Sequence, residues 1–275
     1  MSQQLSTQAP TKRSTKEGEL RFGGIKRLYG NKESEILWQS HVCVIGIGGV
    51  GSWAAEAIAR TGISTITLID LDDVCATNIN RQIHALTGTV GESKIEAMAK
   101  RIKLINPDAT VHLIDDFVTP ENVAEYISKD FDYVIDAIDS VRAKSALIAY
   151  CKRNKIAVIT TGGAGGQTDP TKIEITDIAK TIQDPLMSKV RSQLRRDHHF
   201  SKNPKRKFGV ECVYSTEQLV YPNEDGSVCH QKSTSEGTMK LDCNSGFGAV
   251  SMVTASFGFA AAARVVKKII EKKMG

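Results

Sequence analysis

A glycine-rich turn over residues 46–51 has the spacing of a nucleotide-binding site. Its sequence, Gly46-Ile-Gly-Gly-Val-Gly51, follows an expected strand and opens an expected helix, as in the G-x-G-x-x-G motif. Asp70 ends the next expected strand, 19 residues after Gly51, where its carboxylate could accept ribose hydroxyls. Such glycines let the backbone approach phosphate closely, and the helix start offers it unpaired N–H groups. We therefore expect a nucleotide to be held by Asp70 and by Gly46, Gly48, Gly49 and Gly51.

The residues beyond Asp70 distinguish two kinds of nucleotide chemistry. Taken alone, the turn and Asp70 are typical of an NAD-dependent enzyme, with a purely structural turn as the alternative. Arg81 follows within the next stretch, however, and Lys94 comes 13 residues after it. Two cations beside one nucleotide exceed what hydride transfer needs. They suit a triphosphate, whose charge shifts during phosphoryl or nucleotidyl transfer. We therefore expect ATP at this site.

An acidic pair closes a later strand, in the stretch Asp136-Ala-Ile-Asp139. A carboxylate at the carboxyl edge of a sheet can hold Mg2+ through one or two oxygens, while water and phosphate supply the other ligands. Asp136 fits equally well as a buried turn or helix-capping residue. We therefore assign the metal to Asp139.

Short apolar segments alternate with helical stretches from residue 41 onward. Strands are expected over 41–45, 65–69, 111–114, 133–135 and 156–159, with a helix over 94–105 among those between them. Parallel strands joined by right-handed helical crossovers form a sheet covered on both faces, and ligands bind at the carboxyl ends of its strands. The sequence thus predicts an α/β fold, Rossmann-like and doubly wound, with a mostly parallel sheet.

The remaining segments are expected to extend this fold. Residues 1–19, with nine Ser, Thr or Gln, are predicted to be a disordered lead. Residues 20–275 are predicted to form one domain with antiparallel strands in its added C-terminal part. Its expected divisions are a nucleotide core over about 40–165, an alternating strand over 172–176, a basic insertion over about 180–210 and a terminal helix over about 246–273.

Positive charge is concentrated in one segment. Residues 189–207 carry eight Lys or Arg and one acid, so the rest of a chain of net charge +5 sums to −2. A solvated surface helix and loop would explain this equally well from charge alone. A polyanion such as RNA is the functional interpretation, because cations that neutralise phosphates release counterions. The candidate RNA contacts are Arg195, Arg196, Lys202, Lys205, Arg206 and Lys207.

Together these motifs resemble the adenylating domain of the ubiquitin-activating-enzyme superfamily, the ThiF-MoeB-HesA group that includes activators of sulfur-carrier proteins. The resemblance implies that Asn78, Arg81 and Lys94 contact ATP phosphates, that Arg81 and Lys94 are catalytic, and that Asp139 holds Mg2+. It also implies a homodimer in which an N-terminal arginine, Arg21 or Arg27, reaches the neighbouring subunit's ATP. A cysteine-desulfurase accessory protein is a further partner that it suggests.

One branch of this superfamily, which acts on tRNA, is similar over a longer stretch, from about residue 20 to the end. Its likeness rests on Arg21-Phe-Gly-Gly, residues 46–55 and 115–120, Thr161-Gly-Gly-Ala-Gly-Gly166, residues 181–186 and Asp242-Cys-Asn-Ser-Gly-Phe-Gly248. This implies ATP-dependent dehydration of N6-threonylcarbamoyladenosine beside the anticodon, through adenylation of its carboxylate. The alternatives are an adenylyltransferase for a small sulfur-carrier protein and a non-catalytic nucleotide-sensing scaffold.

The six cysteines include no Cys-x-x-Cys pair, so we expect no zinc site, in contrast to many sulfur-carrier activators. In some relatives the acyl group passes to a cysteine and forms a thioester. By this resemblance Cys243 is a tentative catalytic residue, and Cys229 is a second candidate. Buried or incidental thiols are the alternative, because an intramolecular cyclisation needs no thioester.

Cysteine usage and the lack of an apolar leader predict a cytoplasmic protein. Residues 245–263 carry no charge, which leaves membrane association as an alternative. Six Ala, three Gly, three Ser and one Thr in this run favour instead a helix packed closely against a sheet or a second subunit.

Overall fold

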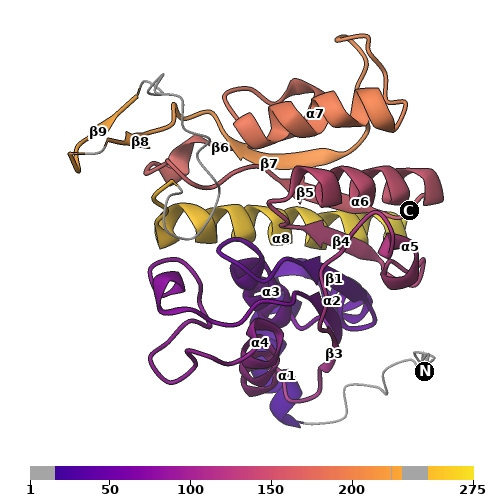
Figure 1. The fold of residues 1–275 in the computed structure, drawn as a ribbon. Helices are drawn as coiled ribbons and strands as arrows, with labels where there is room; N and C mark the ends of the chain where they lie inside the picture. The colour runs from indigo at the N-terminus through magenta and orange to yellow at the C-terminus, as the bar shows by residue number, and fades with distance from the viewer. Residues whose placement is uncertain (1–15, 224, 231–246) are drawn as a thin grey trace.

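The computed structural model describes residues 16–223, 225–230 and 247–275, and their main sheet has β4 at its centre with β1 beside it (Figure 1). Within this part of the chain the sheet has seven strands in the order β3-β2-β1-β4-β5-β7-β6. All neighbours pair in parallel except β6 and β7. The strands are β1 (His41–Ile45), β2 (Thr65–Ile69), β3 (Thr110–Ile114), β4 (Tyr133–Asp136), β5 (Val158–Thr161), β6 (Ile173–Asp177) and β7 (Glu211–Ser215). A small antiparallel pair, β8 (Tyr221–Pro222) and β9 (Val228–Cys229), lies apart from it. The predicted doubly wound α/β fold is confirmed.

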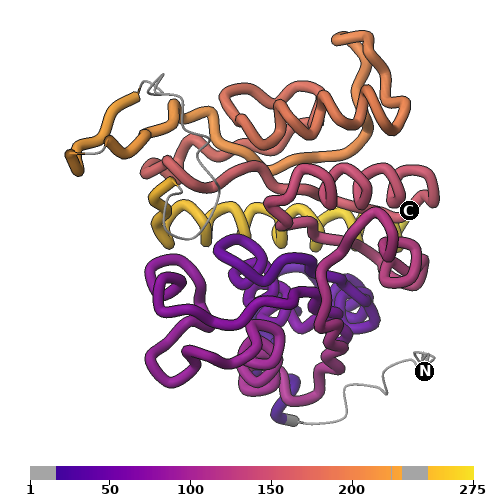
Figure 2. The backbone as a smooth tube through the Cα atoms, in the orientation of Figure 1, coloured from indigo at the N-terminus to yellow at the C-terminus, as the bar shows by residue number. Residues whose placement is uncertain are grey.

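Helices cover both faces of the sheet because alternate strand residues point to opposite sides. Val42 and Val44 of β1 join one apolar cluster with α2, α3, α4 and α8, whereas Cys43 and Ile45 join a second with α5, α6 and α7. α1 and α2 precede the sheet in the chain, and the backbone tube in Figure 2 draws this N-terminal part in indigo. The helices are α1 (Lys16–Tyr29), α2 (Asn31–Trp38), α3 (Gly51–Arg60), α4 (Lys94–Ile105), α5 (Val123–Tyr126), α6 (Val141–Asn154), α7 (Pro185–Asp197) and α8 (Ser251–Met274).

The strand order places the nucleotide motif at the switch point of the sheet. From β1 the chain proceeds outward to β2 and β3, and then returns to the other side of β1 through β4. The turn after β1 and the turn after β4 therefore meet at one carboxyl edge, where ligands bind in open α/β sheets.

Several predicted boundaries require correction. Residues 16–19, predicted as part of an irregular lead, form the first turn of α1, where Glu17 pairs with Arg21; residues 1–15 lie outside the described residues. β5 begins at Val158, two residues later than predicted. The reason is that Lys155 ends α6 in a left-handed conformation and the Ile156 N–H still donates to the Cys151 carbonyl.

The terminal helix begins at Ser251 rather than near residue 246, which is not described. Val250 is extended, and the Gly248 carbonyl accepts a hydrogen bond from the Gly166 N–H.

The described part of the uncharged stretch, residues 247–263, packs closely against a neighbouring helix, as its small residues predict. A Cβ on Gly258 of α8 would lie 2.7 Å from the Val50 oxygen and 2.8 Å from the Ala54 nitrogen, so α3 and α8 meet backbone to backbone. Among the described helices, none has both the length and the hydropathy needed to cross a membrane.

We expect Gly258→Ala to lower the free energy of unfolding by about 1–3 kcal/mol, because the added methyl group meets backbone that cannot move aside. Denaturant unfolding followed by circular dichroism measures this. Gly88→Ala is the matched control, since a Cβ at Gly88 has no atom within 4 Å. Equal effects of the two substitutions would contradict the close α3–α8 contact.

Candidate nucleotide and RNA site

The four motif glycines serve two different purposes. Gly46 has a positive φ of 82°, and a Cβ on it would lie 2.9 Å from the Ala137 oxygen; a Cβ on Gly51 would lie 1.8 Å from the Gly46 oxygen. Backbone packing therefore requires glycine at both positions. At Gly48 and Gly49 the nearest atoms are side chains, and their N–H groups donate to no backbone acceptor among the described residues. Those two N–H groups are available to a phosphate.

Asp70 closes the turn from the neighbouring strand. Its Oδ2 accepts a hydrogen bond from the Ile47 N–H at 2.5 Å, and its Oδ1 accepts one from the Asp72 N–H at 2.9 Å. Burial raises the pKa of this carboxyl group, against the effect of nearby Lys94 and of the two backbone donors. Each oxygen keeps a further lone pair, so the fixed carboxylate can still accept a ribose hydroxyl.

Lys94 and Arg81 approach the turn from the segment after β2. Lys94 is buried, and its Nζ contacts Asp72 Oδ2 at 2.6 Å. The Arg81 side chain passes over Gly49, where a Cβ would lie 3.5 Å from its Cδ, and its guanidinium donates to the Thr77 carbonyl. Arg81 therefore lies beside the glycine turn, and Lys94 lies near Asp70, whose carboxylate binds the turn at Ile47.

Two residues that the sequence analysis missed hold Arg81 in place. The Arg81 carbonyl accepts hydrogen bonds from Trp53 Nε1 of α3 at 3.0 Å and from Thr254 Oγ1 of α8 at 3.2 Å. Asn78, predicted at the phosphates, is buried, and its Oδ1 accepts from the Cys75 N–H at 3.1 Å. No sequence motif reveals Thr254, because it is brought to the site by a helix 173 residues further along the chain.

Buried polar atoms without partners lie beside the same turn. Among the described residues, Gln82 Oε1 and both ring nitrogens of His84 lack hydrogen-bond partners. Gln82 is close to Gly48, where a Cβ would lie 3.9 Å from its Nε2. Burial, with Lys94 and Arg101 nearby, lowers the pKa of His84 to about 4. Because buried polar groups normally find partners, the unpaired Gln82 oxygen fits a site completed by a bound ligand or water.

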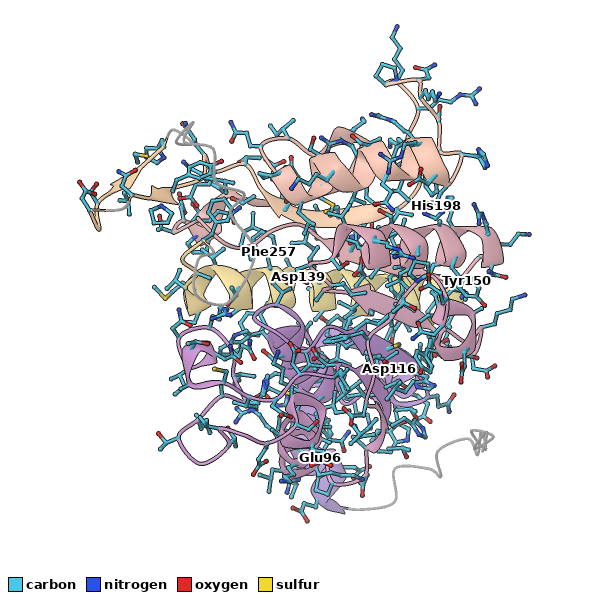
Figure 3. All side chains as sticks on the ribbon, in the orientation of Figure 1. Glu96, Asp116, Asp139, Tyr150, His198 and Phe257 are labelled. Atoms are coloured by element: carbon cyan, nitrogen blue, oxygen red, sulfur yellow. The ribbon has the colours of Figure 1, made fainter. Side chains whose placement is uncertain are left out.

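The two acidic residues at the end of β4 and in the turn after it have different environments. Asp136 is fully buried, and its Oδ2 lies 2.9 Å from Lys144 Nζ and accepts from Thr160 Oγ1 at 2.6 Å. Its Oδ1 accepts from the Ile138 N–H. Asp139, labelled in Figure 3, is exposed and makes no ion pair or hydrogen bond with any described residue. Asp136 is thus the structural residue, and Asp139 has a carboxylate free to bind a cation.

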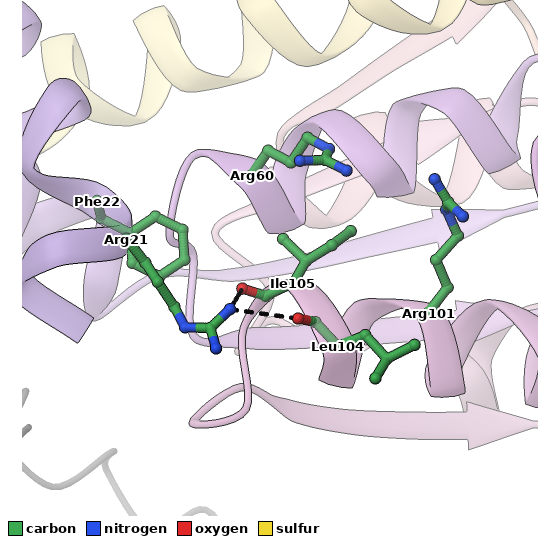
Figure 4. A pocket seen from close by; sticks show the side chains of 6 residues that line it. All are labelled: Arg21, Phe22, Arg60, Arg101, Leu104 and Ile105. Carbon is green, nitrogen blue, oxygen red and sulfur yellow. Dashed lines mark hydrogen bonds between the residues drawn. The ribbon is translucent and has the colours of Figure 1, made fainter. Parts of the chain in front are cut away.

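The candidate trans arginine lies away from its own chain's glycine turn. Arg21 Nη1 donates to the Leu104 and Ile105 carbonyls at the end of α4, in a pocket of about 400 Å³ that Arg60 also lines (Figure 4). Arg60 is the last residue of α3, and a helix of that length spans about 15 Å from the glycine turn. Arg27 is exposed and makes no hydrogen bond or ion pair with the described residues.

The cysteine candidates are only partly described. Cys243 lies outside the described residues. Cys229, half-buried in β9, donates through its thiol to Asn223 Oδ1 at 3.4 Å. An exposed thiol, Cys75, has its pKa lowered by the Thr77 hydroxyl, which donates to its sulfur.

The predicted RNA contacts lie on α7 and the loop after it. Arg195 stacks over Phe208 at 5.4 Å from its ring centroid, and exposed Arg196 pairs with Asp197. The lysines and arginine of the loop, Lys202, Lys205, Arg206 and Lys207, are exposed. The predicted cations therefore lie together on α7 and on the loop that follows it.

The doubly wound fold, with its glycine turn at the switch point of the sheet, is that of a nucleotide-binding α/β protein. The chain belongs to the ThiF family, whose model matches residues 24–275. A similar protein is the tRNA threonylcarbamoyladenosine dehydratase of Escherichia coli K12, 63% identical over 92% of this chain and 94% of that protein. A crystal structure of the E. coli enzyme with ATP matches with a TM-score of 0.84 and 56% identity, over 94% of this chain and 98% of that one. The same enzyme with AMP gives a TM-score of 0.85 and 56% identity, over 95% and 98%.

We expect Asp136→Asn to lower the free energy of unfolding by about 3–5 kcal/mol, because it leaves the Lys144 ammonium buried without a counter-ion. Thermal and urea unfolding measure this. Asp139→Asn is the matched control and should change stability by no more than about 0.5 kcal/mol, since its side chain is exposed and unpaired. The assignment of the two roles fails if Asp139→Asn is the more damaging substitution.

Proposed function

We propose that this chain catalyses the ATP-dependent dehydration of N6-threonylcarbamoyladenosine beside the anticodon of tRNA. The observation that carries the proposal is the combination, in one chain, of a glycine turn beside Arg81, of Lys94 near Asp70, and of separate exposed cations on α7 and the loop after it. The relatives that match over nearly their full length are named as tRNA threonylcarbamoyladenosine dehydratases, and one was crystallised with ATP and with AMP.

The chemistry begins with a carboxylate, which is a poor electrophile. The threonyl carboxylate attacks the α-phosphorus of ATP, pyrophosphate leaves, and an acyl adenylate forms. The carbamoyl group of the same side chain then attacks the activated carbonyl, loses a proton, and expels AMP together with one former carboxylate oxygen. Because the second step is intramolecular, positioning supplies much of the rate.

The described residues have distinct roles in this scheme. Gly48 and Gly49 donate N–H groups to phosphate, Asp70 accepts from the ribose, and Asn78 supports the phosphate-binding segment. Arg81 and Lys94 stabilise the charge that develops on the transferring phosphate. Lys94 would exchange its ion pair with Asp72 for one with the nucleotide, so that its buried ammonium keeps an anionic partner throughout.

The single free carboxylate of Asp139 fits Mg2+, which takes one or two protein carboxylates and fills its shell with phosphate and water. When bound, the ion neutralises charge on the triphosphate. Asp139 comes from the turn whose Ala137 touches the glycine turn, so the two stretches share one edge of the sheet.

A homodimer would complete the site. Arg21 is held beside Arg60 at the far end of α3 in its own chain, so in this scheme it acts on another subunit's nucleotide. Arg27, exposed and unpaired among the described residues, offers a second guanidinium for this role. We place the protein in the cytoplasm, where its RNA substrate is found. The family resemblance adds a cysteine-desulfurase accessory protein as a further proposed partner.

We expect Arg81→Ala and Lys94→Met to reduce AMP transfer by about a hundredfold or more, with the fold retained, because each removes a cation from the transition state. The direct measurement is mass spectrometry of tRNA nucleosides after incubation with ATP and Mg2+. Pyrophosphate exchange that appears only with a diglycine-tailed protein would instead indicate a sulfur-carrier activator, and no exchange with either substrate would indicate a scaffold. Near-native turnover by either variant would contradict its phosphate role.

Neutralising the loop cations tests the RNA surface separately. The triple variant Lys205→Gln, Arg206→Gln, Lys207→Gln should weaken tRNA binding and lower the slope of log affinity against log salt concentration by up to about two to three units, because fewer counterions are released. ATP binding should stay unchanged. An unaltered salt slope would remove this loop from the RNA interface.

A further inference from the structure

Asp184 joins the basic helix to the loop that follows β5. It is the N-cap of α7, and its Oδ1 accepts a hydrogen bond from the Met187 N–H at 2.9 Å. Its Oδ2 accepts from the Gly163 N–H at 3.0 Å. The carboxyl group is buried, with 4% of the residue exposed. One carboxylate therefore joins two segments of the chain, and Asp184 lies 21 residues after Gly163.

The loop is shaped around this carboxylate. A Cβ on Gly162 would lie 1.9 Å from Asp184 Oδ2, so a larger residue there would displace the acid. The loop is further held by the Gly162 N–H, which donates to the Val213 carbonyl of β7, and by the Gly166 N–H, which donates to Gly248 ahead of α8. It is thus fixed on several sides, and Asp184 supplies its link to α7.

The same loop begins at the catalytic edge. Thr160 and Thr161, the last residues of β5, donate to the side chain and the carbonyl of Asp136 respectively. Asp136 in turn holds the Ile138 N–H of the turn that presents Asp139. A chain of hydrogen bonds and one strand end therefore connects the start of α7 to the candidate metal ligand.

We propose that Asp184 is a positioning residue that sets the register between RNA held on α7 and the adenylating edge of the sheet. This inference rests on the proposed function. The cations of α7 lie along its length, with Arg196 about 17 Å from the helix start. A substrate anchored there meets the α-phosphate only if α7 keeps a fixed relation to the loop after β5. Small errors of placement cost much of the rate when a reaction depends on orientation.

The chain offers a matched control at the other end of the basic segment. Asp177 caps the short helical turn after β6 by accepting from the Ala179 N–H, and it also accepts from the Phe208 and Gly209 N–H groups. It therefore holds the end of the basic loop without touching the loop after β5. Both acids are caps with backbone partners, but only Asp184 contacts the catalytic side.

The experiment compares Asp184→Asn with Asp177→Asn in the full chain. Asparagine is as good an N-cap as aspartate, but its amide has an acceptor oxygen at only one of the two positions, so each orientation loses either the bond from Met187 or the bond from Gly163 and no longer joins α7 to the loop through both. Asp184→Ser, which also caps with one oxygen, is the second variant should the first be unstable. For each variant, kcat and KM for tRNA, the Kd for tRNA and the Kd for ATP are measured.

We expect Asp184→Asn to lower kcat at saturating tRNA by about tenfold to a hundredfold, with both Kd values within about twofold of native. Asp177→Asn should raise the Kd and KM for tRNA severalfold and leave kcat within about twofold. Native kcat in the stable Asp184 variants, or an equal loss of kcat in Asp177→Asn, would overturn the inference. If the native chain forms no dehydrated nucleoside with ATP, the proposed function itself fails.

Discussion

The buried ion pair between Asp136 and Lys144 is the interaction on which the site depends most. Both side chains are fully buried, which is tolerable only because they pair at 2.9 Å and share Thr160 as a further partner. Lys144 belongs to α6, Asp136 ends β4, and Thr160 lies in β5. The pair therefore fixes the turn between β4 and α6, and that turn carries Asp139 to the edge where the glycine turn of β1 arrives.

A second constraint is the close approach of backbone segments around the nucleotide site. Gly46 touches Ala137, Gly51 touches Gly46, and Gly258 brings α8 against α3. Through this last contact the C-terminal helix places Thr254 on the Arg81 carbonyl. Residues from widely separated parts of the chain thus set the position of Arg81, the cation that we propose binds phosphate. A rigid site suits chemistry in which orientation and fixed charge provide most of the acceleration.

The proposed RNA surface and the proposed nucleotide site are different in kind. The nucleotide residues are largely buried or backbone groups held by several partners, whereas the loop cations are exposed and little restrained by one another. Exposed cations bind a polyanion without demanding one geometry, because affinity comes from counterion release. Precise placement must then come from the elements that carry the cations. A carboxylate holds each end of the basic segment, because Asp184 caps α7 and Asp177 accepts from the Phe208 and Gly209 N–H groups.

Local sequence was sufficient for the elements whose pattern is short-range. The limits of β1, β2 and α4 agree with their predicted ranges, because apolar alternation and helix periodicity are properties of neighbouring residues. The spacing of the glycine motif, Asp70, Arg81 and Lys94 likewise predicted a nucleotide site at this edge of the sheet. Tertiary structure alone decided that Lys144 is the buried partner of Asp136, that Trp53 and Thr254 hold Arg81, and that α7 is tied to the loop after β5. Each of these depends on which distant segments meet, and a carboxylate has the same sequence signature whether its partner is a buried lysine, a backbone N–H or solvent.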